Sequence, residues 1–219
     1  MGTKWSYIQL KNRGFDLAEL QSCLNILAND LKNASYAPTD PFRKFLESQL
    51  SSDGLEILFQ LRAAERESWN EPPQIAFRAN SEWLPLFQIY LCGGGHPSVQ
   101  DLKRLSKTFD TPVMFFSIFD SDSLFLSYCD GATGMCQEYF KPNWDEDVNY
   151  DMRRYQKAFP EFLVWLCPPE HRAELRRVWD SDEVFADDRM LKLFRLLGME
   201  IFDPETEQFP QGFEIVRPE

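Results

Sequence analysis

Basic residues are scarce in this sequence: 23 lysines and arginines accompany 35 aspartates and glutamates, so that the 219 residues carry a net charge of −12. Because lysine and arginine make the phosphate contacts on which nucleic-acid binding depends, this balance argues against general binding to DNA or RNA. The same charge balance disfavours binding to an anionic membrane surface. A basic protein, in contrast, would be attracted to the acidic surface of this chain. The alternative interpretation is that the acidity maintains solubility.

Long apolar runs are also missing, so no segment is expected to cross a bilayer, and no secretory segment is recognised. The five cysteines contain no C-x-x-C pair and are odd in number; they lie at positions 23, 92, 129, 136 and 167. This usage predicts reduced thiols in a cytoplasmic protein. Thiols scattered in this way do not supply the clustered ligands of a structural zinc site.

Catalytic motifs are absent as well. The glycine-rich stretch LCGGGHPS lacks the lysine of a phosphate-binding loop and the G-x-G-x-x-G spacing of a dinucleotide fold, and neither G-x-S-x-G nor H-E-x-x-H occurs. There are only two histidines, His96 and His171. The spacing of Cys92 and His96 leaves a nucleophilic pair open, with an incidental thiol as the alternative. No cofactor is predicted.

Strong helical and β patterns are present. Leucines at 17, 20, 24, 27 and 31 step by three and four, which predicts an amphipathic helix after Asp16. Two apolar runs around the tripeptide DSD predict a β-hairpin near 112–129. Asp187 is expected to cap a late helix that Gly198 ends. The fold class is therefore α+β, with a mixed or antiparallel sheet packed against several amphipathic helices. One domain is expected over 1–219, with 141–150 as the only candidate boundary.

Two aspartate pairs recur in similar surroundings, FDSDSLF at 119–125 and WDSDEVF at 179–185. Asp and Ser favour turns because their side chains bond to nearby backbone N–H groups. A calcium-binding loop would need an oxygen ligand at its fifth position, where the first pair has Leu124 and the second Val184. Turns are the favoured interpretation. The alternative is a metal-dependent hydrolase that uses Asp120 and Asp122 with other carboxylates.

Acidic residues also gather around aromatic ones, in NWDEDVNYD and WDSDEVFADD. An aromatic ring supplies buried area in a protein interface, and the surrounding carboxylates meet a basic partner. The candidate interface residues are Trp144, Asp145, Asp147, Trp179, Asp180 and Asp182. The alternative is a solvated acidic face whose aromatic rings turn inward to the core.

A resemblance accompanies these patterns. The passage LKRLSKTFDTPVMFFSIFDSDSLFLSYCDGATG, followed later by LRRVWDSDEVFADDRMLKLFRLLGM, resembles a group of uncharacterised small acidic bacterial proteins in which a helix leads into a hairpin. In its acidity and aromatic content the chain is also similar to the immunity proteins that neutralise polymorphic toxins. That likeness implies a cytoplasmic protein that binds another protein.

The leading hypothesis is therefore a non-enzymatic, cytoplasmic protein-binding protein, with an immunity-type inhibitor of a basic toxin as its specific form. The first alternative is the metal-dependent hydrolase. The second is a structural protein whose apolar faces are covered by copies of itself, because the sequence leaves the oligomeric state open.

Overall fold

The computed structural model describes residues 5–33, 72–87, 97, 99–119, 123–142, 158–181, 185–200 and 212–219. Its centre is a seven-stranded sheet in which all neighbours are antiparallel. In order across the sheet, the strands are β6 (Met135–Pro142), β5 (Ser123–Asp130), β4 (Val113–Phe119), β1 (Trp5–Lys11), β3 (Trp83–Phe87), β2 (Gln74–Phe77) and β7 (Glu214–Val216). Strands from both ends of the chain therefore share one sheet.

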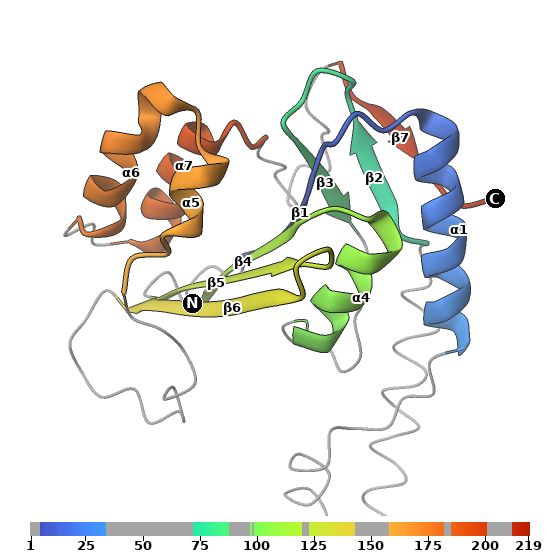
Figure 1. Cartoon of the computed structure of the whole chain (residues 1–219), viewed down its shortest axis with the longest axis horizontal. Coiled ribbons are helices and arrows are strands. Elements are labelled where there is room, and N and C mark those ends of the chain that lie inside the picture. The colour runs from blue at the N-terminus through green and yellow to red at the C-terminus, as the bar shows by residue number, and fades with distance from the viewer. Residues whose placement is uncertain are drawn as a thin grey trace, which may run out of the picture.

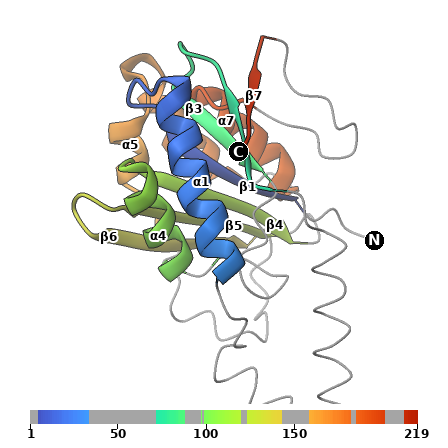
Figure 2. The same ribbon diagram turned by 90° about the vertical axis from the view of Figure 1, so that its right-hand side faces the viewer.

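Helices cover both faces of this sheet. One face carries α5 (Phe162–Leu166), α6 (Arg172–Trp179) and α7 (Ala186–Leu197), with a short 3₁₀ turn, η2 (Pro169–His171), before α6. The other face carries α1 (Leu17–Asn33) and α4 (Val99–Phe109). Figure 1 shows the two groups on opposite sides of the strands, and Figure 2 shows α1 and α4 in front of the sheet with α5 and α7 behind it.

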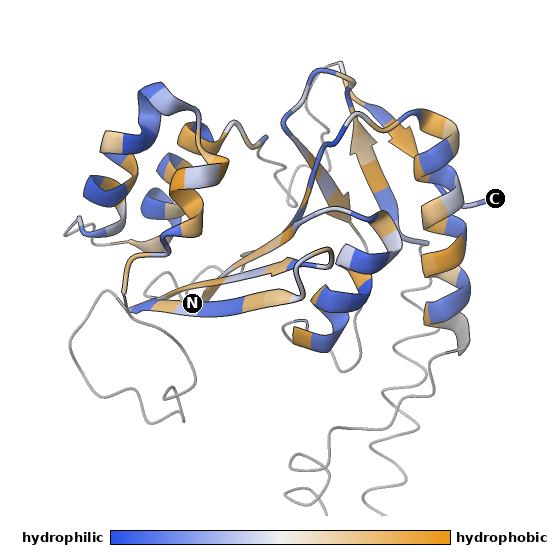
Figure 3. Cartoon of the chain, in the orientation of Figure 1, coloured by the Kyte–Doolittle hydropathy of each residue, from blue (hydrophilic) through white to orange (hydrophobic). Residues whose placement is uncertain are grey.

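The two layers of helices create two hydrophobic cores, because successive side chains of a strand point to opposite faces. In β4, Met114 and Phe116 face the α5–α7 helices, whereas Val113 and Phe115 face α1 and α4. Figure 3 shows apolar and polar residues interleaved along the helices that cover the sheet. A sheet covered on both sides needs apolar residues at consecutive positions, which explains the near-continuous apolar runs of its central strands.

The α+β class, the antiparallel sheet and the hairpin of β4 and β5 are confirmed. The segment 74–87 forms β2 and β3. Pro85 is tolerated inside β3 although this strand has a neighbour on each side. The pairing of β3 with β2 extends only over Leu86 and Phe87, so the missing N–H of Pro85 falls outside that ladder.

Two expectations are wrong. Asp187 does not cap α7, because the helix already begins at Ala186, with Phe185 at the N-cap and no side-chain hydrogen bond there. Gly198 does end the helix, in the left-handed conformation at φ 68°. The thiols are not all reduced, since Cys129 and Cys136 form a disulfide. The register of β5 and β6 places these two residues directly opposite each other, which the spacing of the cysteines alone did not indicate.

Among the described residues, no helix is both long and apolar enough to cross a membrane. The candidate boundary at 141–150 falls almost entirely outside the described ranges.

Candidate protein-binding surface

The end of α6 and the start of α7 form a corner that carries part of the second acidic stretch. We call it the α6–α7 corner and define it by its described residues Asp180, Ser181, Phe185, Asp187 and Asp188. The backbone N–H of Asp180 donates to the carbonyl oxygen of Arg176 over 2.9 Å and so continues the last turn of α6. The chain then leaves the helix and enters α7 at Ala186.

Arg189 supports this corner from inside. Its side chain is 1% exposed, and its Nη2 donates a hydrogen bond of 2.9 Å to the carbonyl oxygen of Ser181. The hydroxyl of Ser181 in turn donates to the carbonyl oxygen of Val178 over 2.7 Å. A buried guanidinium can satisfy several acceptors at once, because its five N–H donors have a fixed planar arrangement. The buried side chain of Arg189 therefore links the two helix ends beneath the surface.

The two aromatic residues of this acidic stretch have opposite environments. Trp179 is fully buried, and its indole contacts the rings of Tyr139 and Phe159 edge-on at 6.4 Å in each case. Trp179 is therefore not available as an interface anchor. It fits the alternative interpretation of the acidic stretch, in which the aromatic ring turns inward to the core. Phe185 is the exposed ring of the corner, with 51% of its surface accessible.

Two carboxylates of the corner lie at helix ends of opposite partial charge. Asp188 lies in the first turn of α7, where the partial positive charge of the helix end stabilises an acid. Asp180 lies at the C-terminal end of α6, where the partial charge is negative and an acid is disfavoured. Its exposed carboxylate has no ion pair with any described residue. The position of Asp180 therefore does not serve the stability of its own helix.

A second exposed aromatic residue, Trp165, was missed by the sequence analysis. It lies on α5 and is 71% exposed, the highest value among the large hydrophobic residues described. The only indication of this exposure in the sequence was Glu161. A charged residue four positions before Trp165 lies on the same side of a helical path, and that side is expected to face solvent. The apolar sequence FLVWLC hid this signal, because neighbours of Trp165 on both sides pack into the core.

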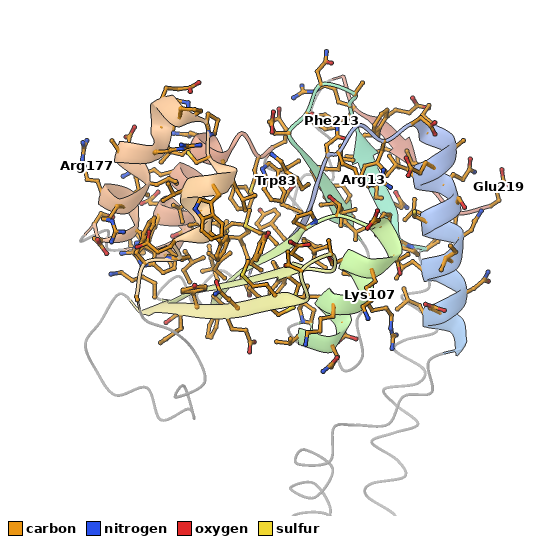
Figure 4. The ribbon with its side chains drawn as sticks, viewed as in Figure 1. Arg13, Trp83, Lys107, Arg177, Phe213 and Glu219 are labelled. Carbon is orange, nitrogen blue, oxygen red and sulfur yellow. A yellow bond between two sulfur atoms is a disulfide. The ribbon has the colours of Figure 1, made fainter. Side chains whose placement is uncertain are left out.

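The surroundings of Trp165 are held in place. Arg176 forms an ion pair with Glu161 at 2.5 Å, and its guanidinium lies 4.4 Å from the centre of the Phe159 ring. Arg177, next to it on α6, points away from the sheet (Figure 4). Because Cys167 Sγ lies 3.3 Å from the carbonyl oxygen of Leu196, the α5 end adjoins the C-terminal end of α7. Trp165 and Phe185 thus lie toward opposite ends of α7, which is about 16–18 Å long.

Most other candidate residues lie outside the described ranges. These are Trp144, Asp145, Asp147, Asp182, Cys92 and His96, together with Asp120 and Asp122 of the alternative metal site. Within the described part of the chain, no group of three or more histidine, cysteine, aspartate or glutamate side chains is placed to hold a metal ion.

The thiols of Cys23 and Cys167 are poorly suited to nucleophilic chemistry. Both are buried, and burial is the main cause that raises the pKa of each above the ordinary value of 9.0. Glu19 adds to this rise for Cys23, while Arg172 opposes it for Cys167. Since the thiolate is the reactive form, a raised pKa keeps these thiols protonated and inert at neutral pH.

The negative charge of the protein is unevenly distributed. The described ranges contain 15 lysines and arginines and 17 aspartates and glutamates, a net charge of −2. The remaining −10 of the total of −12 belongs to residues outside those ranges. The described scaffold is therefore almost neutral, and acidic groups such as those of the α6–α7 corner are local features of it.

Comparison of the chain with family profiles, with curated proteins and with solved structures found no match in any of the three.

Proposed function

We propose that this protein acts by binding another protein, and that its specific role is that of an immunity-type inhibitor of a basic toxin. The observation that carries the proposal concerns the corner that buried Arg189 links: it exposes the ring of Phe185, and it carries Asp180, whose carboxylate has no ion pair with any described residue. An aromatic ring beside carboxylates on a rigid support is a typical arrangement of an interface anchor.

Two physical arguments support a binding role over a purely structural one. An exposed phenylalanine contributes little to the core, so its 51% exposed ring is available to a partner. Asp180 has no ion pair among the described residues and lies at a helix C-terminus, where an acid is mildly unfavourable, so we attribute its presence to binding. Residues that lower the stability of a protein are commonly found at its functional sites.

The test is binding to the products of the genes adjacent to its own, co-expressed one at a time and measured at low and at high salt. Asp180→Lys is expected to weaken the complex about 30-fold or more, because a cation would then face the basic partner. Phe185→Ala should weaken it to a similar degree. The matched control is Glu174→Lys, an equal charge reversal at an exposed position within α6.

The toxin-specific part of the proposal has its own readout. Co-expression of the wild-type chain should restore growth to cells that produce the toxic partner, and Asp180→Lys should not. The proposal is wrong if no neighbouring gene product binds, or if Asp180→Lys and Glu174→Lys weaken binding equally. If Trp165→Ala abolishes binding while the corner variants do not, the partner binds at α5 and the assignment of the corner is wrong.

A further inference from the structure

The Cys129–Cys136 disulfide joins two positions with very different access to solvent. Cys129 lies in β5 and is 1% exposed, and its Sγ is 3.9 Å from the carbonyl oxygen of Val99 at the start of α4. Cys136 is partly exposed and lies in β6, the outermost strand at this end of the described sheet. One sulfur therefore lies beneath a helix, and the other lies at an edge.

The turn that this disulfide closes is packed against α4. Between the two cysteines, Gly131 donates its N–H to the hydroxyl of Ser106 over 2.6 Å. The same hydroxyl donates to the carbonyl oxygen of Thr111 over 2.6 Å, so Ser106 connects the hairpin turn to the end of α4. A side chain at Gly131 would lie 3.1 Å from the backbone of Ser106 and Lys107, which shows how closely turn and helix approach.

We propose that Cys129–Cys136 is a thiol-exchange site at which an external low-molecular-weight thiol attacks the sulfur of Cys136. The rate of thiol–disulfide exchange depends on which sulfur the incoming thiolate can approach in line with the S–S bond. Burial of Cys129 beneath α4 blocks the approach to that sulfur. Cys136 packs against the same core as Cys129 but is partly exposed in the outermost strand, so it is the residue of the pair that an external thiol can reach.

The chemistry balances with two molecules of thiol. The first thiolate forms a bond to the sulfur of Cys136, the S–S bond breaks, and Cys129 leaves as a thiolate that takes up a proton. A second thiolate then attacks the external sulfur of the mixed disulfide and releases Cys136 as a thiolate, which is also protonated. Two external thiols are thereby oxidised to one disulfide, and the protein disulfide is reduced to two thiols.

Reduction should loosen the turn from α4 without disturbing the helices on the opposite face. The covalent ring from Cys129 to Cys136 restricts the turn, and its opening gives the chain more conformations in which the Gly131 N–H is free of Ser106. The α5–α7 helices pack on the other face of the sheet and share no hydrogen bond with this turn among the contacts described.

The test treats the native, oxidised full-length protein with limiting reduced glutathione, followed by acid quenching and mapping of the modified peptides by mass spectrometry. The glutathione adduct is expected on Cys136 at least about tenfold more often than on Cys129. Cys129→Ser and Cys136→Ser provide an independent measurement. Oxidised glutathione should modify Cys136 in the former at once, and Cys129 in the latter only after unfolding.

The second readout is amide hydrogen exchange. Reduction should speed exchange at Gly131 about tenfold, while exchange within α7 stays unchanged. Equal adducts on both cysteines, an adduct mainly on Cys129, reaction only in denaturant, or no disulfide in the native protein would each overturn the exchange site. Unchanged exchange at Gly131 would overturn the coupling of the disulfide to α4.

Discussion

The guanidinium of Arg189 donates a hydrogen bond of 2.9 Å to the carbonyl oxygen of Ser181 across the α6–α7 corner. These residues are eight positions apart, and one is buried while the other is partly exposed. The bond fixes the end of α6 relative to the start of α7. It therefore also fixes Asp180 and Phe185, the two residues to which we assign partner binding.

Arg189→Ala should lower the free energy of unfolding by about 2–4 kcal/mol, because it leaves a cavity and removes the donor to the Ser181 carbonyl. Urea unfolding at neutral pH measures this loss. The control is Arg195→Ala, an exposed arginine in the last turn of the same helix, which should lower stability by no more than about 1 kcal/mol. Similar losses for both variants would show that Arg189 does not support the corner.

The two described tryptophans of the α5–α7 layer should respond in opposite ways to truncation. Trp179→Ala is expected to cost about 3–5 kcal/mol, because Trp179 is fully buried and contacts two other rings. Trp165→Ala is expected to cost at most about 0.5 kcal/mol, since most of its surface is already in water. Thermal or urea unfolding of the two variants side by side checks the contrast, and a larger loss for Trp165→Ala would contradict it.

Neutralising the two exposed acids of the corner should change stability in opposite directions. Asp180→Asn removes an acid from the C-terminal end of α6 and should raise the free energy of unfolding by about 0.3–1 kcal/mol. Asp188→Asn removes an acid from the first turn of α7 and should lower it by a similar amount. Both effects should shrink in 1 M salt, where charges are screened. The same sign for both variants would refute the helix-end argument for Asp180.

Tyr128 makes stability depend on alkaline pH. Burial, with a smaller contribution from Asp130, raises the pKa of its hydroxyl from 10.0 to about 12. Below pH 10 the hydroxyl is protonated in both states, so its contribution to stability is fully present. Between pH 10 and about 12 the unfolded chain loses the proton before the folded one, and this contribution is lost as the pH rises. Tyr128→Phe should therefore flatten the fall in melting temperature over this range; an unchanged slope would show that other groups cause it.

Gly131→Ala should destabilise the protein by about 1–3 kcal/mol, because the added methyl group would lie 3.1 Å from backbone atoms of α4 that cannot yield easily. The neighbouring exposed residue provides a control, and Ala132→Ser should change stability by at most about 0.5 kcal/mol. If Gly131→Ala is as stable as the wild type, the turn can move away from α4 without cost. The close approach of the turn to α4 would then not require glycine at position 131.

The elements whose residues are close together in the chain were predictable. The pairing of β4 and β5 follows from two apolar runs on either side of the tripeptide DSD, and both strands occur where those runs are. Helix α7 ends at Gly198 because glycine adopts the left-handed conformation without steric cost. Such features depend on local backbone geometry and on the spacing of apolar residues, which a sequence displays directly.

The environments of individual residues were decided by tertiary structure. Trp165 and Trp179 both lie near the C-terminal end of a short helix, yet the packing of α5 and α6 on the sheet exposes one and buries the other. Likewise, Cys129 and Cys136 become a covalent pair only through the register of β5 and β6, and α4 then shields one sulfur of the two. Burial and pairing depend on which surfaces meet across the fold, and residue spacing within a single segment does not contain that information.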